Sequence, residues 1–222
     1  MDFLRNLINI FLHLDQFLGS NFANYGPWTY AILFFIIFME TGFVVTPFLP
    51  GDSLLFAAGA YASLGSINVF ILTGLLMIAA VGGDTVNYWI GHRIGASVYT
   101  SNSRCIKKEY LDRTQAFFKK HGGKTIFLAR FVPIIRTFAP FVAGVGQMPY
   151  GYFISYNIFG GILWVALFAL AGYFFGNIPF IKHNFSLVIL GIVFISLIPA
   201  IVEFIRSKRS KNSEVLQEQE TE

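Results

Sequence analysis

Residues 125–148 read TIFLARFVPIIRTFAPFVAGVGQM, an apolar stretch that contains two arginines and two prolines. About 20 apolar residues are long enough to cross a bilayer, but a charge at the bilayer centre costs about 2.5–3.5 kcal/mol. The prolines also interrupt the hydrogen bonds of a continuous helix. Charge and irregular backbone at membrane depth are tolerated only inside protein or beside water. We therefore predict a re-entrant hairpin here; an ordinary kinked helix is the alternative.

The composition of the whole chain is that of a membrane protein. Of its 222 residues, 55% are hydrophobic, 18% are aromatic and only 13% are charged. Mean hydropathy is +0.61. These values exclude a disordered or collagen-like chain and an ordinary soluble enzyme. A single cysteine, Cys105, excludes an internal disulfide framework. Because the apolar runs are long and unbroken, the sequence predicts an all-α polytopic membrane protein.

The basic residues predict the topology. Twelve of the 16 lysines and arginines fall in residues 93–124 and 206–211, which the positive-inside rule places in the cytoplasm. We interpret these stretches as loops that flank the membrane and not as a nucleic-acid site. An even number of crossings then places both termini in the cytoplasm. Four segments have about the length of a true span: 27–45, 68–91, 152–175 and 186–205.

Other segments are predicted to lie outside the bilayer core. Residues 1–20 carry apolar side chains at helical spacing, which predicts an amphipathic helix in the membrane interface. Residues 92–124 are predicted to form a basic cytoplasmic loop. The acidic tail, residues 212–222, is predicted to be disordered. Residues 1–211 would then form a single membrane domain.

A second broken apolar stretch, residues 43–65, contains the motif TPFLPGD at 46–52. We predict that it forms the opposed counterpart of the hairpin at 125–148, so that four transmembrane helices and two re-entrant hairpins make an inverted repeat. Such repeats, with broken helices that meet near the midplane, are typical of secondary transporters. Gly172 and Gly176, four residues apart, favour close helix packing. The repeat itself is weak: Ala58-Gly59 matches Ala143-Gly144 at an offset of 85, and Gly82-Gly83 matches Gly160-Gly161 at 78.

Five ionisable residues stand in apolar surroundings: Glu40, Asp52, Asp84, Arg130 and Arg136. Because charged groups are costly in lipid, we expect these side chains to face one another or a cavity. A break at Pro133 would let both arginines point into one cavity. The arginine fork suits phosphate and carboxylate groups, and burial favours the neutral, protonated form of a carboxyl group. We therefore assign the two arginines to anion binding and the three carboxylates to proton coupling.

A purely structural role is the alternative for the same residues. The charged pairs could serve only to hold the two hairpins together. For Asp84 the alternative is as strong as the functional interpretation, because Asn87 and Tyr88 share its helix face and could satisfy its carboxylate.

The sequence offers little support for an enzyme. Pro50-Gly51-Asp52 and Gly83-Asp84 are similar to the glycine-aspartate pairs of intramembrane aspartyl proteases, but over two residues only. A lipid phosphatase would need a nucleophile or a histidine–aspartate arrangement near the arginines. The four histidines instead lie at or outside the predicted membrane boundaries. The chain contains no phosphate loop, dinucleotide fingerprint or metal-ligand cluster. We therefore predict a protein that is not an enzyme and that has no cofactor or metal.

Two segments resemble a known family. Residues 127–144, FLARFVPIIRTFAPFVAG, resemble the arginine-proline signature of the bacterial DedA inner-membrane proteins. Glu40-Thr41-Gly42 together with residues 47–55, PFLPGDSLL, resembles the acidic signature of that family. The likeness covers nearly the whole chain. It implies two membrane-embedded hairpins, an inner-membrane location, and functional roles for the residues that match the signatures: Glu40, Asp52, Arg130 and Arg136.

The resemblance also implies a substrate class. Members of the family are associated with envelope maintenance and with transport of a lipid phosphate, and undecaprenyl phosphate is the leading candidate in some members. We therefore predict a proton-coupled transporter or flippase of an anionic lipid, either undecaprenyl phosphate or a phospholipid. Its partners would be membrane lipids and protons, with no nucleic acid, and the oligomeric state stays open. The alternatives are a small-ion or proton antiporter and a non-transporting assembly or scaffold protein.

Overall fold

The computed structural model describes residues 27–43, 51–65, 67–100 and 122–176, together with a few single positions between 114 and 191. In the four continuous segments the chain is helical and contains no strand, which confirms the all-α prediction there. The predicted helix at 1–20, most of the motif at 46–52, Cys105, most of the span at 186–205 and the tail at 212–222 lie outside the described residues. The helices are α3 (Trp28–Gly42), α4 (Gly51–Ala62), α5 (Val69–Thr100), α7 (Lys124–Ala129), α8 (Pro133–Val145) and α9 (Tyr150–Phe175).

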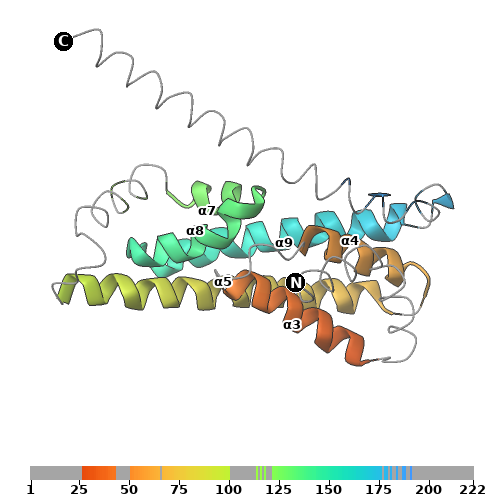
Figure 1. Ribbon diagram of the computed structural model, residues 1–222, viewed down its shortest axis with the longest axis horizontal. Coiled ribbons are helices and arrows are strands. Elements are labelled where there is room, and N and C mark those ends of the chain that lie inside the picture. Colours follow the sequence, from red (N-terminus) through yellow and green to blue (C-terminus); the bar gives the residue numbers. More distant parts are fainter. Residues whose placement is uncertain are drawn as a thin grey trace, which may run out of the picture.

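Two long helices, α5 and α9, frame the molecule. They have 32 and 26 residues, and both are apolar enough over a sufficient length to cross a bilayer. In Figure 1 they lie side by side, with the shorter helices packed beside them. Helix α5 continues past the predicted end of its span at residue 91, so the first part of the predicted basic loop is helical.

Helix α3 differs from the prediction, because it has only 15 residues and falls short of the predicted span at 27–45. At its start the hydroxyl of Tyr30 accepts a hydrogen bond from the backbone N–H of Asn68 (2.7 Å), just before α5 begins. At its end Gly42 lies against Gly83, in the middle of α5. Helix α3 thus lies along the half of α5 between Asn68 and Gly83.

Helix α4 returns the chain from that midpoint. It begins at Gly51, whose N–H donates to the carboxylate of Glu40 near the end of α3 (3.2 Å). A short turn after Ala62 then leads into α5. Figure 1 shows α3 and α4 on the same half of the molecule. Of the hairpin predicted at 43–65, the structure thus describes α4, whose start meets the end of α3.

The second half of the chain contains a similar break. Helix α7 ends at Ala129, and α8 begins with Pro133 after a residue, Val132, in extended conformation. Proline is well suited to the first position of a helix, because the N–H that it lacks has no partner there. The predicted break at Pro133 is confirmed, while Pro140 lies inside α8.

Two of the short helices each pack on the long helix from the other half of the sequence. Helix α4 packs on α9, and α8 packs on α5. A β-carbon on Gly59 of α4 would overlap the carbonyl oxygen of Ala169 in α9. In the same way, a β-carbon on Gly144 of α8 would overlap the carbonyl oxygen of Tyr88 in α5. Both crossings therefore depend on a glycine that lets two backbones touch.

These two crossings use equivalent positions. Gly144 lies 85 residues after Gly59, and their contacts Tyr88 and Ala169 lie 81 residues apart. The match of Ala58-Gly59 to Ala143-Gly144 therefore coincides with a shared contact. For the long helices the contacts give an offset of 81 residues, so the predicted offset of 78 is wrong by about one helical turn. Gly172 and Gly176 pack closely on α4, as predicted, and their counterparts 81 residues earlier, Gly91 and Gly95, pack on α8.

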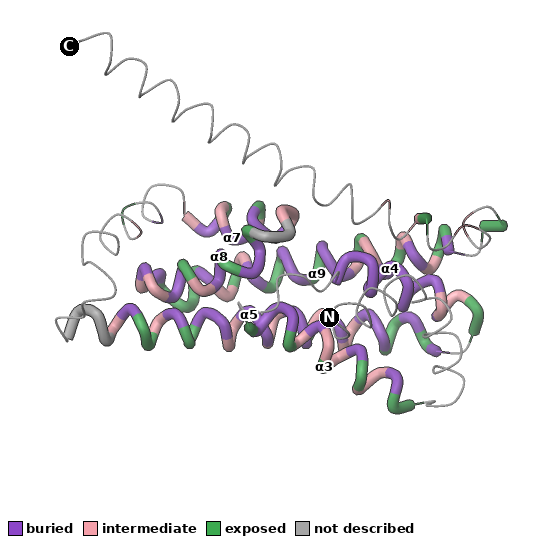
Figure 2. Tube along the Cα trace, viewed as in Figure 1, coloured by how far each residue is buried: buried purple, intermediate pink, exposed green. Residues whose placement is uncertain are grey.

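Burial follows the contacts between long and short helices. Figure 2 shows buried positions where the helices meet and exposed positions along their outer sides. Large apolar side chains dominate those outer sides: Phe70 is 82% exposed on α5, and Phe159 is 70% exposed on α9. Apolar surface of this extent suits lipid better than water. The buried charged side chains of the described residues are the exception in the interior, and they form the site described next.

Candidate functional site

The ends of four helices meet beside the middle of α5 and α9. These are the end of α3, the start of α4, the end of α7 and the start of α8. They carry four of the five charged residues that the sequence singles out, and α5 supplies the fifth. All five residues are at most 8% exposed, and they form ion pairs with one another. The prediction that these side chains face each other is confirmed for Glu40, Asp52, Asp84, Arg130 and Arg136.

The first group of contacts is the Arg136 cluster, which consists of Glu40, Asp52 and Arg136. The guanidinium forks between two helices, because Nη1 donates to Oδ1 of Asp52 (2.5 Å) and Nη2 donates to Oε1 of Glu40. The same oxygen of Glu40 accepts the N–H of Gly51 at the start of α4. The positive end of that helix dipole favours both carboxylates. A β-carbon on Gly51 would overlap the Glu40 carboxylate, so the close approach requires glycine.

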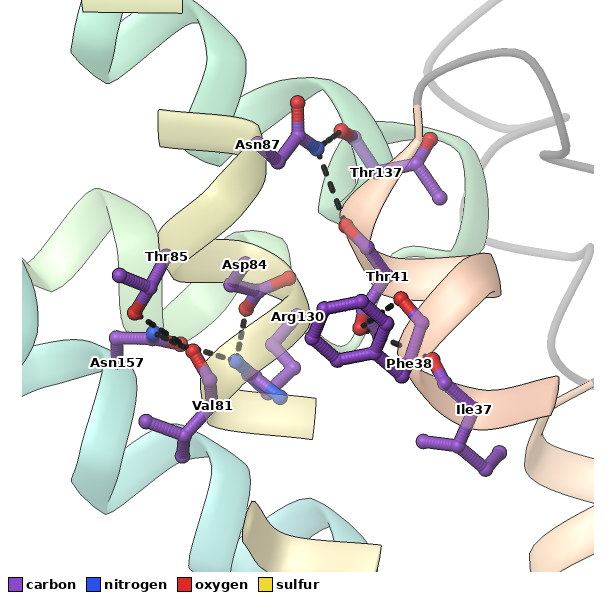
Figure 3. A network of polar contacts seen from close by, with 10 residues as sticks. All are labelled: Ile37, Phe38, Thr41, Val81, Asp84, Thr85, Asn87, Arg130, Thr137 and Asn157. Carbon is purple, nitrogen blue, oxygen red and sulfur yellow. Dashed lines mark hydrogen bonds and ion pairs between the residues drawn. The ribbon is translucent and has the colours of Figure 1, made fainter. Parts of the chain in front are cut away.

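The second group is the Arg130 cluster, which consists of Asp84, Arg130 and Asn157 (Figure 3). Nη2 of Arg130 donates both to Oδ2 of Asp84 and to Oδ1 of Asn157. The amide of Asn157 in turn donates to the backbone carbonyl of Val81 (3.1 Å). Arg130 is thereby held between the two long helices, in the turn that follows α7.

The neighbours that the sequence suggested for Asp84 have other partners. The side-chain amide of Asn87 donates to the backbone carbonyls of Thr41 (3.2 Å) and Thr137 (2.8 Å), which ties α5 to both α3 and α8 (Figure 3). The hydroxyl of Tyr88 donates to the carbonyl of Met148. The carboxylate of Asp84 is instead held by Arg130. That part of the alternative interpretation is wrong.

Trp164 lies between the two clusters. Its indole N–H donates to Oδ1 of Asp52 (2.8 Å), the oxygen that Arg136 also binds. The centre of its ring lies 4.6 Å from Cζ of Arg136 and 5.8 Å from Cζ of Arg130. Both distances are within the range of a cation–π interaction, which is about 6 Å. Trp164 is 1% exposed and is the largest fully buried side chain among the described residues.

Sequence reasoning missed Asn157 and Trp164, although both carry a signal. Asn157 is the one side-chain amide in the apolar run from Tyr150 to Phe175. Tryptophans of membrane proteins gather at the two interfaces, whereas Trp164 stands in the middle of that run. A neutral polar group far from an interface is a further indication that a helix faces other polar groups.

A small cavity separates the two guanidinium groups. It is lined by both arginines together with Thr41, Asp84, Thr137 and Trp164. Its volume is about 10 Å³, which is the room that one water molecule needs. The arginines thus share one cavity, as predicted, but a phosphate group does not fit in it. An anion can enter only if the carboxylates move away from the arginines.

The site has more acid than base. Three carboxylates face two guanidiniums, so the fully ionised network carries one negative charge in excess. Two of its buried polar atoms, Oε2 of Glu40 and Nε of Arg136, have no hydrogen-bond partner among the described residues. The described part of the chain also has no group of three histidine, cysteine, aspartate or glutamate side chains that would bind a metal ion.

The fold and the site are those of an all-helical membrane protein with a buried charge network where broken helices meet. The VTT domain family matches residues 49–174, which include both arginines, Asp52 and Asp84. The chain is 55% identical over 213 residues to Protein DedA of Escherichia coli K12, and the match covers 95% of this chain and 97% of that protein. The chain therefore belongs to the DedA family, which confirms the predicted resemblance.

Other relatives extend the comparison. An uncharacterized membrane protein of Mycobacterium leprae is 46% identical over 178 residues, which cover 80% of each chain. The inner membrane protein YqjA of Escherichia coli K12 is 32% identical over 160 residues, which cover 70% of this chain and 71% of YqjA. No solved structure matches the chain significantly.

Proposed function

We propose that this protein is a proton-coupled transporter that moves an anionic lipid, either undecaprenyl phosphate or a phospholipid, across the bacterial inner membrane. The observation that carries the proposal is the position and make-up of the charge network. Two arginines and three carboxylates share one buried site beside the middle of two helices that are long enough to cross a bilayer. Ionisable groups at membrane depth are costly and usually mark a substrate or ion pathway.

The arginines are suited to a phosphate head group. A guanidinium stays charged when it is buried, and its planar fork matches the oxygens of a phosphate. Arg130 and Arg136 face one cavity and one tryptophan ring, so a phosphate between them could be held by both. The hydrocarbon chain of the lipid would stay in the bilayer, beside the exposed apolar side chains of α5 and α9.

The carboxylates couple this binding to protons. We call the site closed when the arginines are bound to carboxylates, as they are in this structure. In the closed site the arginine N–H groups that a phosphate would need already donate to these carboxylates. A phosphate that displaces them leaves buried, unpaired carboxylates, which cost about 3–5 kcal/mol when they stay charged. Protonation removes that cost. Binding of the anion and uptake of a proton by Glu40, Asp52 or Asp84 are therefore one linked event, and no chemical bond of the lipid is broken.

The topology belongs to the same proposal. We place the broken segments 43–65 and 125–148 as two opposed re-entrant hairpins, with α4 in the first and α7 and α8 in the second. The equivalent glycine contacts of α4 with α9 and of α8 with α5 support an inverted repeat. The basic segments support cytoplasmic termini, and the name of the relative YqjA supports an inner-membrane location.

A non-transporting scaffold protein is the second candidate. Both arginines are paired with carboxylates of the protein, which is what a purely structural charge network requires. A scaffold would keep these contacts permanently. A transporter must break and remake them, and only a transporter predicts an effect of phosphate lipids and of a proton gradient.

The experiment that separates the two candidates measures lipid reorientation in proteoliposomes. The purified protein is reconstituted with a lipid phosphate whose exposure on the outer leaflet is read with an impermeant reagent, with and without a proton gradient. We expect reorientation that depends on the gradient in the wild type and in Arg93→Gln, which removes an exposed arginine of α5, but not in Arg136→Lys. Reorientation equal to that of protein-free liposomes would show that the chain does not transport this lipid.

A further inference from the structure

The structure points to a positioning role for Trp164, and this inference rests on the proposed transport function. We propose that Trp164 links the two arginine clusters, so that both release their carboxylates and accept the phosphate together. The side chain contacts Asp52 and Arg136 of one cluster and Arg130 of the other. One residue therefore responds to a change in either.

The contact with the Arg136 cluster is polar and directional. The indole N–H and Nη1 of Arg136 bind the same oxygen of Asp52. When that carboxylate takes up a proton or moves, the hydrogen bond that orients the indole is weakened. The ring can then tilt away from its present position on the two guanidiniums. Protonation in the Arg136 cluster is in this way transmitted to the tryptophan.

The contact with the Arg130 cluster is made by the ring face. A guanidinium over the face of tryptophan is attracted by the ring quadrupole, and the attraction depends on distance and angle. Besides its contact with the ring, Arg130 donates hydrogen bonds to Asp84 and Asn157. A tilt of the ring therefore shifts Arg130 toward or away from its carboxylate. The rigidity of the indole makes it better suited to this role than a flexible aliphatic side chain.

The cavity explains why the two clusters must act together. A space for about one water molecule lies between the arginines, and the tryptophan forms one of its walls. A phosphate needs several times that volume, so it enters only when both guanidiniums and the ring give way. A phosphate bound to one arginine alone would lose half of its charge-assisted hydrogen bonds.

Fluorescence tests the movement of the ring directly. The chain has three tryptophans, and Trp28 and Trp89 are 71% and 44% exposed, outside the two clusters. In Trp28→Phe/Trp89→Phe only Trp164 emits, and in the matched control Trp28→Phe/Trp164→Phe only Trp89 emits. We expect titration with dodecyl phosphate in detergent to change the emission of Trp164 and to leave that of Trp89 unchanged.

A double-mutant cycle tests the coupling. Glu40→Gln and Asp84→Asn each neutralise one carboxylate that pairs with an arginine, and the affinity for dodecyl phosphate is measured for both single variants and for the double variant. With Trp164 present, we expect the double variant to depart from the product of the single effects by about fivefold or more. In a Trp164→Leu background, the departure should fall to about twofold, the level of independent sites. Trp164→Phe keeps the ring face without the N–H and should lie between the two.

The outcomes separate this inference from the proposed function. Dodecyl phosphate that binds without changing Trp164 emission, or a cycle that is unchanged by Trp164→Leu, overturns the role of Trp164 and leaves the transport proposal intact. If the protein neither binds dodecyl phosphate nor reorients lipid, the role of Trp164 and the transport proposal are both overturned. Because the fluorescence measurement keeps Trp164 itself, it does not depend on whether Trp164→Leu folds.

Discussion

The two arginine clusters differ in what they connect and in their charge. Arg136 uses two nitrogens to bind two carboxylates, and it joins the end of α3, the start of α4 and the start of α8. Arg130 uses one nitrogen to bind one carboxylate and one amide, and it lies between the two long helices. The fully ionised Arg136 cluster therefore carries one excess negative charge, whereas the Arg130 cluster is neutral.

This difference assigns different tasks to similar residues. A neutral pair held between two long helices can persist without taking up a proton. Two carboxylates on one guanidinium repel each other, and one of them gains from protonation. In the Arg136 cluster, Oε2 of Glu40 has no hydrogen-bond partner among the described residues. A proton on that oxygen would therefore break no hydrogen bond. We infer that proton coupling resides chiefly in the Arg136 cluster.

The largest expected effect comes from removal of an arginine. Arg136→Met leaves two buried carboxylates without their cation, and we expect a loss of stability of about 3–5 kcal/mol. Arg130→Met leaves only Asp84 and should cost less. The measurement is thermal unfolding of the purified variants in detergent. Restoration of stability by Glu40→Gln/Asp52→Asn in the Arg136→Met background would show that unpaired charge, and not lost packing, is the cause. Equal losses for the two arginines would contradict the comparison.

The next effect is on coupling, with the fold retained. Glu40→Gln and Asp52→Asn keep shape and hydrogen bonding but cannot exchange a proton, so we expect both to lose gradient-driven lipid transport. Asp84→Asn should retain it at a lower rate, because the Arg130 cluster has no excess carboxylate. The measurement is the proteoliposome assay, normalised to folded protein. Normal gradient-driven transport by both variants of the Arg136 cluster would assign its carboxylates to structure alone.

Lysine substitutions distinguish phosphate binding from charge balance. Arg130→Lys and Arg136→Lys keep the charge but lose the planar fork. We expect each to weaken binding of a lipid phosphate by about 1–2 kcal/mol, the scale of one charge-assisted hydrogen bond. Binding is measured on purified, folded variants. If the arginines serve only to balance charge, both lysine variants will bind and transport normally.

The stability of the same variants sharpens the comparison. Arg130 reaches Asp84 and Asn157 through a single nitrogen, which a lysine ammonium can imitate. Arg136 divides its two nitrogens between two carboxylates on different helices, which one ammonium reaches less well. We therefore expect Arg136→Lys to unfold at a lower temperature than Arg130→Lys. The opposite order would show that the fork of Arg136 is not needed for stability.

Much of the site could be predicted from the sequence because charge in an apolar run is a strong signal. The cost of Glu40, Asp84 or Arg130 in lipid requires each to have a partner inside the protein. The break at Pro133 was likewise visible in the sequence. The choice of partners was not, since it depends on the register of helices that are far apart in the chain. Nothing local to Asp84 indicates that Arg130, and not Asn87, lies beside it.

The remaining differences also come from tertiary contacts. The length of α3 was overestimated because apolar residues continue past Gly42, whereas the helix ends where it meets Gly83 of α5. The predicted repeat offset of the long helices is wrong because the glycines that were matched make different kinds of contact. Gly82 and Gly83 admit α3, while Gly160 and Gly161 make room for Arg130. Equivalent positions are recognised only from the contacts that they make.

The smallest expected change in stability, and the sharpest test of the comparison, is Asn157→Asp. This substitution gives Arg130 a second carboxylate and so makes the Arg130 cluster similar in charge to the Arg136 cluster. The added charge is desolvated but also paired, and such terms nearly cancel. The carbonyl of Val81 loses the amide N–H of Asn157 but still accepts the hydroxyl of Thr85, so stability should change by no more than about 1 kcal/mol. The new excess carboxylate should take over part of the proton coupling. We therefore expect Glu40→Gln/Asn157→Asp to regain gradient-driven transport that Glu40→Gln alone lacks.

The matched control is Glu40→Gln/Asn157→Leu, which removes the amide without adding a carboxylate and should stay uncoupled. If the aspartate variant also stays uncoupled while it is folded and binds lipid phosphate, an excess carboxylate is not what couples this site to protons. The contact of the Glu40 carboxylate with the N–H of Gly51 at the start of α4 must then matter instead.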